Sequence, residues 1–206
     1  LLTEELPPLE IHASTQCDIR TPEKAAFLDN LGFNQIVLAR ELTLEEIRRC
    51  REAMARARIE FFVHGALCVS YSGRCYLSCA ETGRSANRGA CAQPCRLPYS
   101  VFDRDGRELA HRNHVLSLMD NDQSGNLEAL VDAGVTSFKI EGRLKDTAYV
   151  KNITAYYRQK LDDLIRRRQA DGWHSESLGN TTFTFTPDPR RTFHRGATGC
   201  RIRLKG

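Results

Sequence analysis

The sequence lacks any run of 18 apolar residues, and its opening stretch, LLTEELPPLE, lacks the basic segment followed by an apolar one that begins a secretory signal. The sequence therefore predicts no membrane span and no signal peptide, so we expect a cytoplasmic protein. A large excess of one charge is also missing, because 30 Lys and Arg stand against 26 Asp and Glu among 206 residues. Short basic runs at 48–49, 166–168 and 190–191 permit a polyanionic partner without requiring one.

Short apolar segments alternate with helical patterns along most of the chain. Five buried strands are predicted from the apolar runs at 9–14, 35–41, 59–65, 114–120 and 135–143. Helices are predicted between them at 23–33, 43–57 and 124–134, followed by a long helix at about 146–169. This alternation is typical of a parallel sheet covered on both faces. Five βα units are too few for a closed eight-stranded barrel, so the sheet is either open or the later part of a (β/α)8 barrel.

The chain is predicted to divide near residue 170. Residues 1–170 would form a partial (β/α) barrel that is interrupted by a cysteine-rich insertion at 65–100. Residues 171–206 change character, and their alternating TTFTFT is typical of a strand. This part is interpreted as a linker and the truncated start of a small C-terminal β domain.

Polar residues follow the predicted strands where each strand ends. Because barrel enzymes build their active sites at the carboxyl ends of parallel strands, we expect these side chains to share a pocket. Taken singly, each could equally cap a strand or pair on the surface. The ionisable residues at these positions are His12, Arg40, Glu41, His64, Asp120, Lys139, Glu141 and Arg143.

Five of the eight cysteines lie between Cys68 and Cys95, and clustered thiols in a cytosolic protein favour a metal over disulfides. Four of them, Cys68, Cys75, Cys91 and Cys95, are separated by six, fifteen and three residues. Four thiolates can bind a tetrahedral zinc ion or an iron-sulfur cluster. Zinc ribbons usually present two close pairs, whereas only Cys91 and Cys95 are close here. The spacing therefore favours a cluster and leaves zinc as the alternative.

The remaining cysteines have simpler interpretations. Cys17 and Cys50 are expected to be small buried hydrophobic residues. Cys79 is left open as a fifth thiol near the metal, a substitute ligand or filler, and Cys200 receives no role. A Cys–His nucleophile pair is also conceivable, since His64 precedes Cys68 by four residues. A protease is therefore an alternative function, although four thiols at ligand-like intervals argue against it.

Several segments carry a family resemblance, namely IHASTQCDIRT at 11–21, EFFVHGALCVSYSGRCYLS at 60–78, TGRSANRGACAQPCRLPY at 82–99 and SFKIEGR at 137–143. They resemble the collagenase-like peptidase family, whose better understood bacterial members are RNA hydroxylases or partners in oxygen-independent ubiquinone hydroxylation. Text at 82–89 and 191–198 is most similar to the branch that makes 5-hydroxycytidine in large-subunit ribosomal RNA. A sister branch makes 5-hydroxyuridine in transfer RNA, which is the alternative substrate.

The resemblance implies a (β/α)8 TIM-like barrel whose opening strands precede Leu1, so the chain is expected to be a fragment that is inactive alone. It implies that Cys68, Cys75, Cys91 and Cys95 bind a 4Fe-4S cluster, and that prephenate is a co-substrate. The charges of such a dianion would suit Arg40, Lys139 and Arg143 at the strand ends. His64, His12 and Glu141 are candidates for proton transfer, because C5 hydroxylation must remove a proton.

Overall fold

The computed structural model describes residues 9–175, 181–192 and 197–198 and shows a mixed α/β protein. The centre of its sheet consists of parallel strands, in the spatial order β1 (His12–Ala13), β2 (Gln35–Val37), β3 (Arg58–Ala66) and β7 (Val135–Ile140). Two short strands extend this sheet. β6 (Asp120–Asp122) pairs antiparallel with the end of β3, and β8 (Ala197–Thr198) pairs parallel with β6. The predicted parallel sheet is confirmed, whereas the complete eight-stranded barrel stays a prediction.

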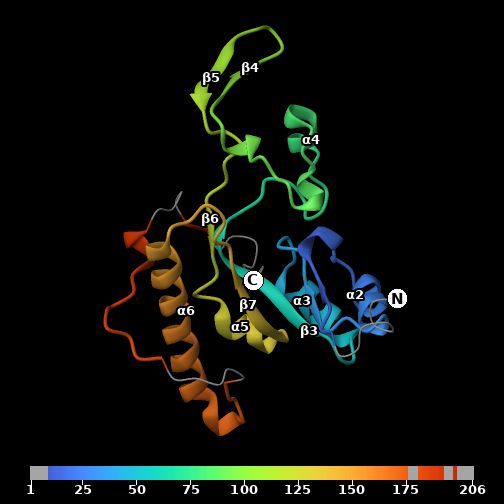
Figure 1. Cartoon of the computed structure of the whole chain (residues 1–206), viewed down its shortest axis with the longest axis vertical. Coiled ribbons are helices and arrows are strands. Elements are labelled where there is room, and N and C mark those ends of the chain that lie inside the picture. The colour runs from blue at the N-terminus through green and yellow to red at the C-terminus, as the bar shows by residue number, and fades with distance from the viewer. Residues whose placement is uncertain (1–8, 176–180, 193–196, 199–206) are drawn as a thin grey trace.

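Helices lie on both sides of β3 (Figure 1). α2 (Pro22–Asn30) and α3 (Leu44–Glu52) pack together on one side, and α5 (Leu127–Asp132) and α6 (Thr147–Arg168) lie on the other. The core between helices and sheet is formed by fully buried side chains, among them Ile36, Leu38, Ile47, Ile59, Phe61, Val63, Leu130, Val135 and Ile153. Because this core is continuous, it fixes the strand ends that carry the site.

Side-chain caps determine where the helices begin. Thr21 caps α2, and Pro22 occupies the first helical position, where its missing N–H costs nothing. Thr43 and Glu46 form the predicted capping box of α3, and Asp146 caps α6. The 3-10 helices are η1 (Thr15–Cys17), η2 (Ala86–Arg88), η3 (Pro94–Arg96), η4 (Gln169–Asp171) and η5 (Pro189–Arg191).

The strand predicted at 114–120 is wrong. Residues 114–119 form a turn and irregular backbone, and β6 begins only at Asp120. Val115 and Met119 are exposed, so the apolar residues of this run do not all face the core. The run leads back from a hairpin that the sequence analysis missed, formed by β4 (Tyr99–Phe102) and β5 (Glu108–Asn113). Figure 1 shows this hairpin and the short helix α4 (Leu77–Thr82) projecting beyond the end of β3.

The C-terminal region also departs from expectation. The alternating Thr and Phe residues at 181–186 form no strand, and β8 joins the main sheet instead. The domain boundary near residue 170 stays a prediction, and Cys200 lies outside the described residues. Across the described part of the chain, no helix combines the length and apolar character that a membrane span needs.

Candidate functional site

Four thiols line one cavity of about 440 Å³ beyond the end of β3. Cys68 follows β3 and Cys75 precedes α4, whereas Cys91 precedes η3 and Cys95 lies within it. Each of the four side chains is partly buried. The structure therefore brings together the cysteines that the spacing singled out, although metal binding by them stays a prediction.

The other described cysteines lie elsewhere. Cys50 is fully buried in the core, which confirms the prediction for this residue, whereas Cys17 is only partly buried and packs against that core. Cys79 is exposed on α4 and does not line the cavity. Cys79 is therefore set apart from the four cavity thiols, although it lies in the same cysteine-rich segment of the sequence.

Hydrogen-bond donors surround the sulfur of Cys91. The N–H of Gln93 donates to Cys91 Sγ at 3.4 Å, and the hydroxyl of Ser78 lies 3.9 Å from the same sulfur. The N–H of Cys75 is held by Asn87 Oδ1 at 2.9 Å, which fixes a second thiol-bearing residue. Donors directed at sulfur stabilise the thiolate, the form that binds metals.

The thiols are close enough to influence one another electrostatically. Burial raises the pKa of the Cys95 thiol, and the Arg96 guanidinium opposes this increase. Negative charge on Cys68, Cys91 and Cys75 adds to the increase. The Cys95 proton is therefore held more tightly than in an exposed cysteine as long as only protein groups surround it.

Cationic side chains line the same cavity. Among them are Arg40, Lys139 and Arg143, which the strand-end pattern predicted. The guanidinium carbon of Arg40 and the Nζ of Lys139 each lie 5.2 Å from the ring centre of Phe62, a cation–π distance. Lys139 Nζ also pairs with Glu60 Oε1 at 3.0 Å. The cavity thus has positive charge beside an apolar ring, while the role of these cations toward a substrate stays a prediction.

Lys145 is a cavity residue that the sequence analysis missed. Its Nζ lies 3.8 Å from Asp120 Oδ2, and the two side chains are only 8% and 4% exposed. The same Nζ lies 4.6 Å from the ring centre of Tyr149. Both groups offset the desolvation of a buried ammonium. The sequence SFKIEGRLK could have indicated this residue, because Lys145 follows the predicted strand-end residue Arg143 by only two positions.

Glu141 lies on the cavity wall and its backbone is held from several sides. Its N–H donates to the His64 carbonyl at 2.8 Å, and its carbonyl accepts from the Tyr149 hydroxyl at 3.1 Å. Its Oε1 accepts the N–H of Arg143 at 2.8 Å. Gly65, at φ +104°, is packed so closely that a Cβ would lie 2.7 Å from the Glu141 carbonyl oxygen. The backbone that carries the Glu141 carboxylate is therefore held firmly in place.

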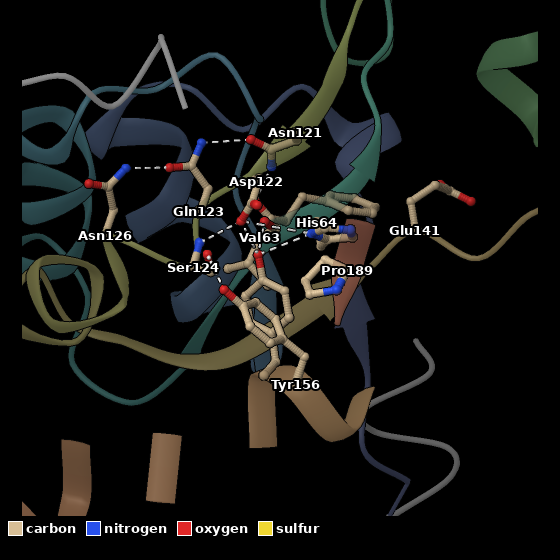
Figure 2. A network of polar contacts seen from close by, with 12 residues as sticks. Val63, His64, Asn121, Asp122, Gln123, Ser124, Asn126, Glu141, Tyr156 and Pro189 are labelled. Carbon is tan, nitrogen blue, oxygen red and sulfur yellow. Dashed lines mark hydrogen bonds and ion pairs between the residues drawn. The ribbon is translucent and has the colours of Figure 1, made fainter. Parts of the chain in front are cut away.

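His64 does not line the cavity but belongs to a buried network, shown in Figure 2. The residue is 7% exposed. Its Nδ1 lies 3.2 Å from the Tyr157 hydroxyl and 3.9 Å from Asp122 Oδ1. That hydroxyl donates toward the Val63 carbonyl at 2.8 Å and Asp122 Oδ1 at 3.1 Å. The tautomer of His64 decides whether its Nδ1 donates to this hydroxyl or accepts from it.

Burial and hydrogen bonding set the charges in this network. Burial alone would raise the pKa of Asp122, but the N–H and hydroxyl of Ser124, the charge of His64 and the Tyr157 hydroxyl hold it below its usual value. Burial, followed by the charge of Asp122, raises the pKa of Tyr157. A neutral phenol thus joins a carboxylate to an imidazole and links β3, β6 and α6.

His12 also lies outside the cavity lining. Its side chain is exposed at the start of β1, where Nε2 lies 3.8 Å from Glu10 Oε2. Of the three predicted proton carriers, the structure therefore places Glu141 on the cavity wall and puts His64 and His12 elsewhere. Proton transfer by any of them stays a prediction.

Comparison with known proteins decides the family. The sequence profile of peptidase family U32 matches residues 1–200. The chain belongs to this family. The collagenase-like resemblance that the motifs predicted is thereby confirmed.

Family U32 relatives differ in the activities that their names state. The chain is 60% identical over 198 residues to the 23S rRNA 5-hydroxycytidine C2501 synthase of Escherichia coli (strain K12). This match covers 96% of the chain and 30% of that relative. It is 40% identical over 166 residues to a collagenase of Porphyromonas gingivalis (strain ATCC BAA-308 / W83), covering 75% of the chain and 40% of the relative. It is 36% identical over 162 residues to tRNA hydroxylation protein P1 of Bacillus subtilis (strain 168), and this match covers 76% of the chain and 38% of the relative.

The chain spans less than half of each of these relatives. No solved structure is significantly similar to it. The family is therefore established by sequence, and the cavity geometry has to be interpreted from the residues themselves.

Proposed function

We propose that this U32 chain is part of an RNA hydroxylase that converts a cytidine of 23S ribosomal RNA to 5-hydroxycytidine. The observation that carries the proposal is the meeting of four thiols and several cations in one cavity. The 60% identity to the Escherichia coli synthase over 96% of the chain supports the same activity and substrate. Such a substrate would place the protein in the cytoplasm.

We propose that the four thiols hold a 4Fe-4S cluster rather than zinc. Only Cys91 and Cys95 form a close pair in the sequence, whereas zinc ribbons usually present two such pairs. The four cysteines line one cavity, and a cluster is larger than an ion and is held by four thiolates. The residues that would hold it are Cys68, Cys75, Cys91 and Cys95. Bound there, the cluster would supply redox or Lewis-acid chemistry at the cavity.

The cations on the cavity wall fit a dianionic co-substrate, which we propose to be prephenate. The planar guanidinium groups of Arg40 and Arg143 can each bind a carboxylate through two parallel hydrogen bonds. Lys139 and Lys145 lie on the same wall, where Glu60 and Asp120 respectively offset part of their charge.

Glu141 is the group that we propose to receive the proton released from C5 of the base. It is the one predicted proton carrier that lines the cavity, and its backbone position is fixed by Gly65, His64 and Tyr149. A base held in place loses little freedom when it meets its substrate.

The rest of the (β/α)8 barrel is also part of the proposal. β1, β2, β3 and β7 are parallel, and the segments that follow them contribute Ser14, Arg40, Cys68 and Glu141 to one cavity. Barrel enzymes place their active sites at this end of their strands. We propose that the remaining strands are supplied by the part of the full-length protein that this chain does not span.

Nucleoside mass spectrometry of RNA from cells lacking the gene tests this function. We expect 5-hydroxycytidine to disappear from 23S ribosomal RNA and to return with the wild-type gene, but not with Cys91→Ser. Cys79→Ser is the matched control, since Cys79 belongs to the same segment and lies outside the cavity lining. It should restore the modification fully.

Other outcomes would redirect the proposal. Unchanged 5-hydroxycytidine with lost 5-hydroxyuridine would assign the chain to transfer RNA, the substrate class that the name of the Bacillus subtilis relative states. Unchanged nucleosides together with peptide-bond cleavage by the purified protein would support the protease alternative. A colourless protein that binds zinc and takes up no iron after anaerobic reconstitution would contradict the cluster.

A further inference from the structure

An exposed aromatic ring lies at the cavity and takes no part in the site described so far. Tyr71 lies between the first two cavity cysteines, Cys68 and Cys75, and lines the cavity while 58% of the residue remains exposed. An aromatic side chain that is both cavity-lining and solvent-accessible leaves apolar surface available to a ligand.

The backbone around Tyr71 is anchored to the strand-end loops. The neighbouring Ser72 is 1% exposed, and its N–H and hydroxyl donate to the two carboxylate oxygens of Glu41 at 2.5 and 3.0 Å. Gly73, at φ +70°, packs so tightly that a Cβ would lie 2.5 Å from the Gln16 carbonyl oxygen. The Tyr71 carbonyl accepts the Arg74 N–H at 3.1 Å and closes a turn. The ring is therefore carried by a fixed turn.

The ring itself is supported from behind. The guanidinium carbon of Arg20 lies 4.9 Å from the ring centre of Tyr71. Arg20 is held by Asp18 through Nε–Oδ1 at 2.6 Å and Nη2–Oδ2 at 3.0 Å. Asp18 Oδ2 also accepts from Arg74 Nε at 2.7 Å. Because a fixed cation covers one face of the ring, the exposed area belongs to the opposite face and the edge.

We propose that Tyr71, supported by Arg20, is the stacking platform on which the target nucleobase rests when it is extruded into the cavity. The inference rests on the proposed RNA hydroxylase function. An enzyme that modifies C5 of a base in structured RNA must take that base out of its stack. Proteins hold unstacked bases on aromatic rings, and a ring whose orientation is already fixed loses little entropy on binding. The cations of the cavity favour the same polyanionic ligand.

Stacking predicts which substitutions at Tyr71 weaken RNA binding. Because the face of the ring makes the interaction, removing the hydroxyl should change the affinity little, whereas removing the aromatic ring should lower it strongly. Arg20 acts as a positioning residue, because it orients the ring without reaching the cavity lining. Tyr76 is a suitable control, since it is exposed in the same segment and lies outside the cavity lining.

The test uses the full-length protein with its cluster reconstituted and a 23S ribosomal RNA fragment that spans C2501. Tyr71→Leu should raise KM and the Kd for this RNA by about 5- to 100-fold, with a smaller change in kcat. Tyr71→Phe and Tyr71→Trp should recover most of that loss, Arg20→Met should give an intermediate value, and Tyr76→Leu should match the wild type. Iron content, measured for every variant, should stay unchanged.

A second readout reports stacking directly. Pyrrolocytidine in place of the target cytidine should be quenched on binding to the wild type and brighter when bound to Tyr71→Leu at saturation. A Tyr71→Leu protein that hydroxylates with the wild-type KM refutes the platform. So does a loss of iron in every Tyr71 variant, because the ring would then support the fold. A wild type that binds and quenches the RNA but forms no 5-hydroxycytidine refutes the hydroxylase function and leaves the platform standing.

Discussion

Asp29, near the end of α2, holds the turn that follows α3 and is 2% exposed. Its carboxylate accepts the N–H groups of Ala55 at 2.8 Å, Arg56 at 3.2 Å and Ala57 at 2.6 Å. Asp29→Ala removes all three hydrogen bonds. Water can act as the new acceptor for the N–H groups of Ala55 and Arg56, which are exposed residues, but not for that of the buried Ala57. A hydrogen bond to a charged group contributes about 1.5–3 kcal/mol, so one full loss and two partial ones amount to about 3–4 kcal/mol.

The contribution of Asp29 should also depend on pH. Burial alone would raise its pKa, but the N–H groups of Ala55, Ala57 and Arg56 hold it below the usual value of 3.8. A carboxyl group whose pKa is lowered by folding stabilises the folded state fully above its unfolded pKa. That stabilisation is lost as the pH falls below about 4 toward the folded pKa.

Urea unfolding followed by circular dichroism at pH 7 and pH 3 measures both effects. Asp29→Asn should be less stable than the wild type at pH 7, and the gap should narrow at pH 3, where the Asp29 carboxyl group of the unfolded wild-type chain takes up a proton and the folded state loses that advantage. Asp105→Asn, which removes an exposed carboxylate in the β4–β5 turn, is the control and should change little at either pH. A loss below 1 kcal/mol in Asp29→Ala, or a gap that is constant from pH 7 to pH 3, would refute this reasoning.

Two further predictions concern the cysteines and Gly65. Burial raises the pKa of Cys50 to about 11, so iodoacetamide at pH 8 should label exposed Cys79 and spare Cys50 in the folded protein; equal labelling rates by mass spectrometry would contradict this. Gly65→Ala should cost about 2–3 kcal/mol and reduce activity, because its Cβ would push on Glu141. Gly125→Ala, with open space around the new Cβ, serves as its control, and equal unfolding midpoints would show that the close packing is unimportant.

Local signals in the sequence were sufficient to place the starts of α2, α3 and α6 and to single out the four cavity thiols. The caps Thr21, Thr43 and Asp146 act within one turn of the residues that they cap, so the chain needs no distant partner to display them. The separation of Cys91 and Cys95 is similarly local, because only three residues lie between them and Cys95 belongs to η3. Features of this range can be predicted without knowing the fold.

The hairpin could have been predicted, but the strand at 114–120 displaced it. Asp105 and Gly106 are a turn signal between two short strands, and Gly106 adopts φ +81°. The run that follows contains enough apolar residues to suggest a buried strand. Arg96 instead binds this run, because its Nη1 donates to Ser117 Oγ at 2.9 Å and to the Leu118 carbonyl at 3.4 Å. A side chain from elsewhere in the chain thus decides its conformation.

His64 shows why strand alternation alone misplaces a site residue. Phe62 and Ala66 line the cavity, and a regular strand would put His64 on the same face. The pairing of β3 with β7 shifts register between Phe62 and His64, which interrupts the alternation. The imidazole then meets Tyr157 of α6, a residue that is 93 positions away in the sequence. Neither the shift nor this partner is visible in the motif.

The cysteine segment and the sheet build the cavity jointly, and this explains which strand-end residues share it. Glu41, after β2, binds Ser72, and Asp18, after β1, binds Arg74. These contacts hold the cysteine segment against the strand ends. The thiols therefore share a cavity with side chains that are distant in the sequence and that the cysteine spacing could not have indicated. A variant that releases the docking, such as Glu41→Ala, would therefore disturb the thiols and the cationic wall together, because each depends on the other for its position.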